Sequence, residues 1–313
     1  MLTIIGKRIL VVVPMLWAIA TIAFYLVNLI PGSPGRTILG DAASQQQVDA
    51  LNHQLGYDRP LLVQYGDWLA GAVRGDFGDS LQSGRSAVGD VTARLPITLS
   101  VAIAATVISV VVGVLVGVAA ANGGRWLDRS LQAASSVAMA VPSFWLGVLL
   151  VFVFALGLKW LPAVGYVPFT EDPGEWLRSI ALPSVSVAMI GTATVSRQTR
   201  AALIHELGQD YIRTLYATGV PTRSIVLKHA LRNASTPIAT TVGFQFIGLL
   251  GSTVIVEQVF GINGLGQLVL GAVTSKDLPL LLTVIVLTTG LVIAVNLIVD
   301  LLTVWLNPKA RRA

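Results

Sequence analysis

The stretch Leu99–Ala121, LSVAIAATVISVVVGVLVGVAAA, carries no charge and is long enough to cross a lipid bilayer as a helix, which takes about 20 apolar residues. Five more segments are apolar enough to span, although the third of these is only just long enough and the last contains Asp300: Ile9–Ile30, Leu131–Leu158, Ser179–Ser196, Asn233–Val256 and Leu278–Trp305. Pro142 predicts a kink in the segment that contains it. The sequence therefore predicts an all-α membrane protein with six transmembrane helices.

The composition agrees with a protein that crosses the membrane several times. Hydrophobic residues make up 54% of the 313 residues and charged residues 12%, whereas a soluble domain has about 25% charged residues. This excludes a soluble, a disordered or a fibrous protein. The chain has no cysteine, which excludes disulfides and thiolate metal sites. The first apolar segment follows Lys7 and Arg8 as in a signal peptide, but it is too long for one, so we expect an uncleaved helix.

The distribution of charge predicts which side of the membrane each segment faces. With a cytoplasmic N-terminus, the cytoplasmic segments hold 13 basic and three acidic residues, and the opposite segments hold eight basic and twelve acidic residues. Basic residues concentrate on the cytoplasmic side of membrane proteins. We therefore predict that the N- and C-termini are both cytoplasmic. The net charge of +5 then reflects topology rather than a nucleic-acid partner.

The sequence offers no catalytic or metal-binding constellation. His205-Glu206-Leu207-Gly208-Gln209 approaches the zinc motif H-E-x-x-H, but Gln209 stands in place of the second histidine. The phosphate-binding motif G-x-x-x-x-G-K-[ST] does not occur, and the glycine-rich run Gly261–Gly266 lies between two predicted spans, where we expect a turn or a re-entrant loop. The three histidines lie on different segments, so an intramembrane hydrolase lacks a nucleophile–base pair. We predict that the chain is not an enzyme and binds no metal or cofactor itself.

The predicted spans contain few groups that could bind a coupling ion. Only Asp300 lies well inside a span, and Glu257 is expected near water at the outer end of the fifth span. Ion-coupled pumps and carriers use intramembrane carboxylates. The sequence therefore favours a conduit that is driven from elsewhere, with an ion-coupled secondary transporter as the alternative class.

Polar side chains within the spans could line such a conduit or hydrogen-bond between helices. The candidates for the lining are Ser143, Thr194, Thr240, Gln245 and Ser252. In the second span Gly113 and Gly117 have the spacing of the close-packing motif G-x-x-x-G, which indicates a helix–helix contact.

The most basic segment, Arg197–Arg232, is predicted to lie on the cytoplasmic side between the fourth and fifth spans. A short amphipathic helix is expected after Gln209, with Tyr211, Leu215 and Thr218 on one face, and Gly219 and Pro221 end it. A second helix begins near Thr222 or Ser224 and runs into the fifth span. A short helix held in this way suits docking into a groove of a soluble partner.

Short motifs along nearly the whole chain resemble those of one family. They are PGSP at 31–34, LGYDRP at 55–60, GDFGDS at 75–80, RLPITL at 94–99, VPSFW at 141–145, QDYIRT at 209–214, HALRNA at 229–234 and GLG at 264–266. In this order and spacing they are similar to the integral-membrane subunits of binding-protein-dependent ABC importers, in particular the B-type permeases of the dipeptide, oligopeptide and nickel group.

In that superfamily the loop before the fifth span carries E-A-A-x-x-x-G and, nine residues later, I-x-L-P. Gly219 matches the glycine, whereas other residues stand at the remaining positions: Arg213, Thr214 and Leu215 for Glu-Ala-Ala, and His229, Leu231 and Arg232 for Ile, Leu and Pro. The peptide-importer branch is similar in using Arg-Thr and His-Ala-Leu-Arg. Leu215 is therefore the individual departure, a larger apolar side chain than the alanine expected there.

The resemblance implies the transmembrane fold of a type I ABC importer. Its parts would be an N-terminal transmembrane helix at 1–30, an extracytoplasmic loop or cap at 31–98, a five-helix permease core at 95–306 that includes a cytoplasmic coupling loop at 197–232, and a cytoplasmic tail at 307–313. The chain would be a multi-pass protein of the cytoplasmic (inner) membrane.

The resemblance also implies a function and partners. The chain would be the permease subunit that imports peptides of the dipeptide or oligopeptide class, with nickel chelates or another small solute as alternative cargo. Its partners would be a homologous C-type permease, two ABC ATPase subunits that bind ATP and Mg²⁺, an extracytoplasmic peptide-binding protein and the lipid bilayer. The ATPase would dock on a coupling helix with the residues Asp210, Tyr211, Arg213, Thr214, Leu215, Ala217 and Gly219, and the binding protein would contact Gly261, Asn263, Gly264 and Gly266.

Overall fold

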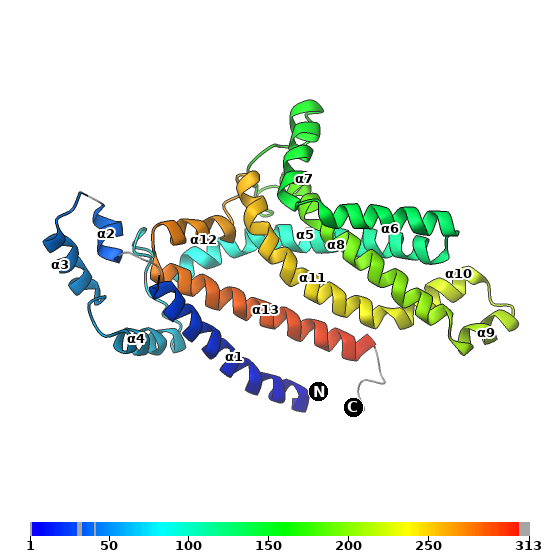
Figure 1. The fold of residues 1–313 in the computed structure, drawn as a ribbon, viewed down its shortest axis with the longest axis horizontal. Coiled ribbons are helices and arrows are strands. Elements are labelled where there is room, and N and C mark those ends of the chain that lie inside the picture. Colours follow the sequence, from blue (N-terminus) through cyan, green and yellow to red (C-terminus); the bar gives the residue numbers. More distant parts are fainter. Residues whose placement is uncertain (1, 30–32, 41, 307–313) are drawn as a thin grey trace. The chain divides into compact units, whose positions relative to one another are not determined.

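The structure, a computed structural model, describes residues 2–29, 33–40 and 42–306, and every regular element among them is a helix (Figure 1). The α-helices are α1 (Leu2–Asn28), α2 (Pro34–Leu39), α3 (Gln45–Leu55), α4 (Leu61–Val73), α5 (Ala87–Asn122), α6 (Arg125–Ala140), α7 (Ser143–Leu150), α8 (Pro173–Leu207), α9 (Asp210–Ala217), α10 (Thr222–Ser224), α11 (Leu231–Val259), α12 (Leu265–Thr274) and α13 (Leu278–Leu306), and two π-helical turns are η1 (Val151–Gly157) and η2 (Ile225–Ala230). The all-helical prediction is confirmed. The predicted tail at 307–313 and the first two residues of the PGSP motif lie outside the described residues.

Four of the described helical segments are long and apolar enough to cross a membrane, and a bent pair could add a fifth. The four are α5, α8, α13 and the continuous segment Thr222–Val259, which joins α10, η2 and α11. The bent pair is α6 with α7 and η1. α1 covers the first predicted span, but its apolar part within the described residues, Val12–Asn28, is shorter than the others. Four to five spans are thus supported where the sequence predicts six.

The third predicted span is not the single kinked helix that the sequence predicts. α6 ends at Ala140 and α7 begins at Ser143, and the two helical segments are bent by 97° at this break. Val141 is extended, with a ψ of 123°. Proline disfavours the helical region for the residue before it and lacks an N–H, so Val141 and Pro142 separate two helices rather than bend one.

The segment predicted as a loop or cap, 31–98, contains α2, α3, α4 and the first turns of α5. A capping box begins α3: the Gln47 N–H donates to Ser44 Oγ at 3.3 Å, and the Ser44 N–H donates to Gln47 Oε1 at 3.0 Å. α5 begins at Ala87, ahead of the apolar run that predicts it, and continues through Pro96. Hydropathy marks the part of a helix that can lie in lipid and not the end of the helix, which explains the difference.

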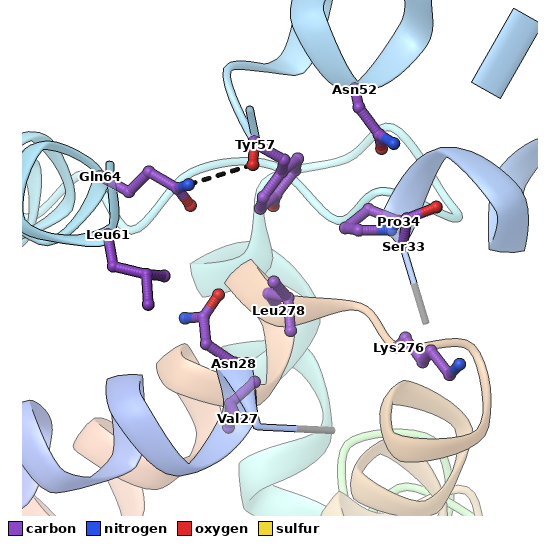
Figure 2. A pocket seen from close by; sticks show the side chains of 10 residues that line it. All are labelled: Val27, Asn28, Ser33, Pro34, Asn52, Tyr57, Leu61, Gln64, Lys276 and Leu278. Carbon is purple, nitrogen blue, oxygen red and sulfur yellow. Dashed lines mark hydrogen bonds between the residues drawn. The ribbon is translucent and has the colours of Figure 1, made fainter. Parts of the chain in front are cut away.

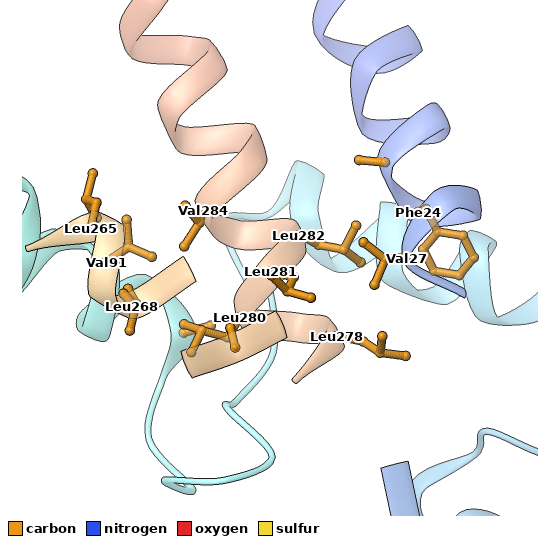
Figure 3. Close-up of a cluster of buried hydrophobic side chains, with 13 residues drawn as sticks. Phe24, Val27, Val91, Leu265, Leu268, Leu278, Leu280, Leu281, Leu282 and Val284 are labelled. Carbon is orange, nitrogen blue, oxygen red and sulfur yellow. The ribbon is translucent and has the colours of Figure 1, made fainter. Parts of the chain in front are cut away.

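The chain forms two compact units, which are described separately. The first comprises Met1–Pro96 and Asn263–Ile293. Figure 3 shows its core, in which side chains of α1, α5, α12 and α13 meet: Ala23, Phe24, Val27, Ala87, Val91, Leu265, Leu268, Ala272, Leu278, Leu280, Leu281, Leu282 and Val284. Helix α4 adds Tyr65 and Trp68, whose ring centroids lie 5.3 and 5.8 Å from that of Phe24. This core attaches α4 to the end of α1.

A buried carboxylate attaches the loop after α4 to the beginning of α13 within the same unit. Asp277 is 1% exposed, and its Oδ2 accepts hydrogen bonds from Ser80 Oγ at 2.5 Å and from the Gln82 N–H at 3.3 Å. Its Oδ1 accepts the Leu280 N–H at 3.2 Å, as the N-cap of a helix does. The GDFGDS motif is therefore held in place through its last residue, Ser80.

Replacement of this carboxylate should loosen the loop. In an Asp277→Ala variant three donors lose their acceptor, and we expect a destabilisation of about 2–4 kcal/mol from the lost cap and the unpaired buried groups. Asp79→Ala is the control, because Asp79 is exposed and lies in the same loop. Thermal unfolding of the purified protein and proteolysis within residues 74–86 are the measurements. Equal unfolding temperatures in the two variants would contradict the assignment.

The second unit comprises Ile97–Ile262 and Ala294–Ala313, and α8 lies at its centre, packed against α6, α7 and α11. The helix–helix contact that the G-x-x-x-G spacing predicts for α5 is confirmed, and the partner helix is α8. A Cβ added at Gly117 would lie 2.6 Å from the Thr199 Cβ and 2.7 Å from the Ser196 carbonyl oxygen, and one at Gly113 would lie 2.8 Å from the Val195 Cβ. Only glycine allows the two helices to approach so closely.

Candidate functional site

The loop between α8 and α11 folds as the sequence predicts. Gly208 and Gln209 alone separate α8 from α9, and α10 follows after a short turn that contains Pro221. In Figure 1, α9 and α10 lie together beyond the ends of α8 and α11. The π-helical turn η2, which joins α10 to α11, was not predicted. π-Helical turns of this kind occur often at functional sites.

Gly219 ends α9 through a Schellman motif. Its φ is +79°, in the left-handed region that favours glycine. The Gly219 N–H donates to the Tyr216 carbonyl at 3.0 Å, and the Val220 N–H donates to the Leu215 carbonyl at 3.1 Å. Val220 and Leu215 both pack against the same apolar cluster, and such an apolar contact often accompanies the motif. The chain can therefore leave α9 sharply and enter α10.

One side of α9 is held by the chain itself. Ile212 is 1% exposed and lies in a cluster with Leu203 of α8 and with Ile225 and Ala230 of η2. The burial of Ile212 was not predicted, because the apolar face was expected to consist of Tyr211, Leu215 and Thr218. Tyr211 and Leu215 do pack against the cluster, but Thr218 is exposed. The spacing of Ile212, Leu215 and Val220 along the loop could have identified the buried side.

The Tyr211 hydroxyl ties α9 to both neighbouring helices. It donates to Glu206 Oε2 of α8 at 2.8 Å and accepts from Asn233 Nδ2 of α11 at 2.9 Å. Partial burial, together with the hydrogen bond to the Glu206 carboxylate, raises the pKa of the Tyr211 phenol above its usual value. The phenol is therefore a hydrogen-bond donor at all physiological pH values.

Removal of this hydroxyl should free α9. For Tyr211→Phe we expect the local stability of α9 to fall by about 1–2 kcal/mol. The variant loses the hydrogen bond to the Glu206 carboxylate and the one from the Asn233 side chain. Hydrogen exchange of the α9 amides should then be about 5- to 30-fold faster. Tyr216→Phe is the matched control, since Tyr216 lies on the same helix and is 48% exposed. Equal exchange rates in both variants would contradict the role of Tyr211.

The opposite side of α9 is exposed. Asp210, Arg213, Thr214, Ala217 and Gly219 are all exposed, and Arg213 pairs with Asp210 at 3.2 Å while both side chains remain largely in solvent. Five of the seven predicted docking residues thus lie on the free surface. The other two, Tyr211 and Leu215, are half-buried against the chain itself and position the helix.

The candidate lining residues lie on three helices that pack together, α7, α8 and α11. The hydroxyls of Thr194, Thr240 and Ser252 donate to carbonyls of their own helix, those of Ile190 at 2.9 Å, Thr236 at 3.1 Å and Leu249 at 2.9 Å. Thr240 is exposed, Thr194, Gln245 and Ser252 are half-buried, and Ser143 is buried at the beginning of α7. Ser143 is thus the one buried residue among the five candidates.

The glycine-rich run Gly261–Gly266 forms a left-handed turn and the beginning of α12. Gly261 has a φ of +57° and, like Asn263, is exposed. Gly264 and Gly266 are buried. Of the four predicted binding-protein contacts, only Gly261 and Asn263 therefore offer surface.

Glu257 does not lie near water, and the expectation that it does is wrong. Its side chain is 0% exposed, and Thr98 Oγ1 donates to its Oε1 at 2.6 Å. A carboxyl group this deeply buried requires hydrogen-bond partners, and the apolar sequence around it gives no sign of them. Thr98 lies on α5, far away in the sequence, which is why sequence reasoning missed the pair.

A cavity of about 250 Å³ lies within the first unit, beside the end of α1 and the beginning of α4 (Figure 2). The polar side chains that line it form hydrogen bonds with the backbone nearby. Gln64 Nε2 donates to the Tyr57 carbonyl at 3.2 Å, and Asn52 Oδ1 accepts the Gly35 N–H at 2.9 Å. Burial, with Asp277 nearby, holds the pKa of the Tyr57 phenol above its usual value. These groups stabilise the fold of the unit.

The sequence matches two protein-family models, which together cover almost its whole length. Residues 109–312 match "Binding-protein-dependent transport system inner membrane component", and residues 1–102 match the N-terminal part of such membrane components. The chain is 36% identical over 312 residues to a protein of Brucella abortus (strain 2308) named for a peptide transport system permease, with 99% of each chain covered. It is 38% identical over 312 residues to the glutathione transport system permease protein GsiC of Escherichia coli (strain K12), again with 99% of each covered.

The fold is similar to that of a solved transporter. A chain of the MetNI methionine ABC transporter, in inward-facing conformations, superposes with a TM-score of 0.58 at 19% identity, with 70% of this chain and 96% of that chain covered. A second crystal form of the same transporter gives a TM-score of 0.52 at 20% identity. The architecture is therefore that of a type I ABC importer.

Proposed function

Because the chain belongs to the family of binding-protein-dependent transport system inner membrane components, we propose that it is the permease subunit of an ATP-driven importer that carries peptides across the cytoplasmic membrane. The names of its relatives, a peptide permease and a glutathione permease, support cargo of the peptide class. Nickel chelates or another small solute are the alternative cargo within the same architecture.

The main support for the proposal is that α9 is buried on one side and exposed on the other. Its buried side is fixed to α8 and η2 by Ile212, and its opposite side is exposed around Thr214. Because α9 follows α8 after only two residues, a partner that moves α9 must also move α8. We propose that α9 is the coupling helix and that an ATPase subunit binds its exposed side. Asp210, Arg213, Thr214, Ala217 and Gly219 would form the contact, and Tyr211 and Leu215 would support it from behind.

The energy would then come from outside this chain. Two ATPase subunits would bind ATP and Mg²⁺, and their closure would displace α9 and switch the spans between two states, as in other rigid-body transitions. A homologous C-type permease would complete the pathway, and an extracytoplasmic peptide-binding protein would deliver the cargo.

The proposed topology has six spans with both termini in the cytoplasm. The asymmetry of basic residues supports this orientation, with α9 on the cytoplasmic side. For that topology α1 must count as a span, and α6 with α7 and η1 must count as one broken span. Residues 31–98 would form the extracytoplasmic cap, 95–306 the permease core and 307–313 the tail.

Within the core, Thr194, Thr240, Gln245 and Ser252 would line the pathway from α8 and α11, and Ser143 would support it from the beginning of α7. Gly261 and Asn263 would contact the binding protein outside, with Gly264 and Gly266 shaping the turn beneath them. Gly261 and Asn263 are exposed whereas Gly264 and Gly266 are buried, and Ser143 is buried whereas the other four candidate lining residues are not. These differences support this division of roles.

A photo-crosslinking experiment tests the docking of the ATPase. A benzophenone side chain at Thr214, introduced into the complex expressed in its native membrane, should crosslink to an ABC ATPase that mass spectrometry identifies. Val164, 65% exposed and predicted to face the other side of the membrane, is the control position. Crosslinks to the ATPase from both positions alike, or from neither, would contradict the proposal.

A further inference from the structure

Helix α6 buries little apolar surface against the rest of the second unit. Its 16 residues include a single buried one, Ser135, and no buried apolar side chain. At its C-terminal end it meets α7 across the 97° break at Val141 and Pro142. Apolar packing that would fix its N-terminal half against α8 is therefore weak, and other contacts must position it.

Two arginines of α8 supply those contacts. Arg200 donates from Nε and from one terminal nitrogen to the two carboxylate oxygens of Asp128, at 2.5 and 2.6 Å. Arg197 donates to Ser136 Oγ at 2.7 Å. A two-pronged contact between guanidinium and carboxylate fixes the angle between its partners as well as their separation. α6 and α8, side by side in Figure 1, are thus locked together.

The Asp128–Arg200 pair is sheltered from solvent in a way that surface pairs are not. The two side chains are 23% and 28% exposed, whereas those of the Arg213–Asp210 pair on α9 are 79% and 94% exposed. Water and salt weaken exposed ion pairs strongly and partly buried ones much less. The pair can therefore transmit a displacement that an exposed pair could not.

The position of Arg200 in α8 gives the pair a consequence for transport. Arg200 lies two turns before the end of α8, next to the part of the helix that leads into α9. We infer that Asp128 and Arg200 are positioning residues, which make α6, and through it α7, move together with α8 when α9 is displaced. This inference rests on the proposed function. The pair adds a second route by which a displacement of α9 reaches the spans. The first route runs from α9 through η2, with which Ile212 packs, into α11.

If the pair is broken, α8 should move without α6. ATP hydrolysis would then continue while transport is lost, because only part of the pathway would follow the motor. A residue with a purely structural role would lower the amount of folded complex instead, and hydrolysis and transport would fall together.

The experiment uses the complete complex in proteoliposomes with labelled dialanine and labelled glutathione as probes. We expect uptake per ATP hydrolysed to fall about tenfold or more in Asp128→Asn and Arg200→Met, within the roughly 5- to 150-fold range of coupling effects. The reversed pair, Asp128→Arg with Arg200→Asp, should restore most of it. Arg200→Lys, which keeps the charge but not the two-pronged contact, should give an intermediate uptake per ATP hydrolysed. It provides a second test of the pair if one of the other variants fails to fold. Glu175→Gln is the matched control, because Glu175 forms an exposed pair with Arg178 in the same helix.

A distance measurement separates this inference from the proposed function. The chain has no cysteine, so spin labels on Ala133→Cys of α6 and Ile204→Cys of α8 report one distance. We expect a narrow distribution, with or without ATP, that broadens in Asp128→Asn and narrows again in the reversed pair. An unchanged distribution or unchanged uptake per ATP in the single variants would overturn the inference. ATP-independent uptake by the wild-type complex would overturn the proposed function instead, and the distances would still test the pair.

Discussion

A Gly219→Pro substitution is expected to abolish transport while the protein still inserts into the membrane. Proline fixes φ near −65°, whereas Gly219 has a φ of +79°, and proline also removes the N–H that donates to the Tyr216 carbonyl. The Schellman motif cannot form, and the chain between α9 and α10 must take another course. Because α9 is proposed to receive the ATPase, we expect uptake to fall by about 100-fold, near the top of the range for coupling effects.

Two further substitutions at the same residue separate backbone conformation from side-chain size. Among the described residues, no atom lies within 4 Å of a Cβ added at Gly219, so space does not limit the replacement. Asparagine tolerates the left-handed region and valine does not. Gly219→Asn should therefore keep most of the uptake, and Gly219→Val should lose most of it. Uptake that is equal in these two variants would contradict the conformational argument.

A Gly117→Leu substitution is expected to prevent the second unit from folding. The first added atom would already lie 2.7 Å from the Ser196 carbonyl oxygen, a backbone atom that moves only if α8 moves. Overpacking of a core costs about 1–3 kcal/mol and occasionally more. Since α8 is the central helix of the unit, we expect a cost at or above the upper end of this range and little folded protein.

The yield of monodisperse protein and its unfolding temperature measure this effect. Gly117→Ala should fold but unfold at a lower temperature than the wild type. Gly248→Leu is the control, because Gly248 is exposed and no atom of the part of the chain that the structure describes lies within 4 Å of an added Cβ. A stable Gly117→Leu protein would show that α5 and α8 do not need their close contact.

The sequence predicted those features that depend on residues near one another in the chain. The apolar runs identified α5, α8, α11 and α13, and Gly219 with Pro221 identified the end of α9. Each of these follows from a local rule of hydropathy or backbone conformation. That Gly117 packs closely against another helix was also predicted, because the spacing of small residues is itself a local signal, but the partner helix α8 was not.

Features that depend on distant residues were missed. Glu257 is hydrogen-bonded by Thr98, and Asp128 is paired with Arg200. No local pattern in the sequence pairs these residues. Ile212 was missed because the burial of an eight-residue helix depends on what packs beneath it, here Leu203 and Ile225. The break at Pro142 was expected only as a kink, since the size of a bend is set by the packing of both helices.

The central claim is that this chain is a gate moved through α9 by a separate ATPase. The most direct measurement is uptake into proteoliposomes that contain either the complete complex or this chain alone, with ATP on the side of α9 or with an imposed proton or sodium gradient. We predict uptake only by the complete complex, only with ATP, and without sensitivity to uncouplers. Accumulation of peptide by the isolated chain in response to a gradient would contradict the account.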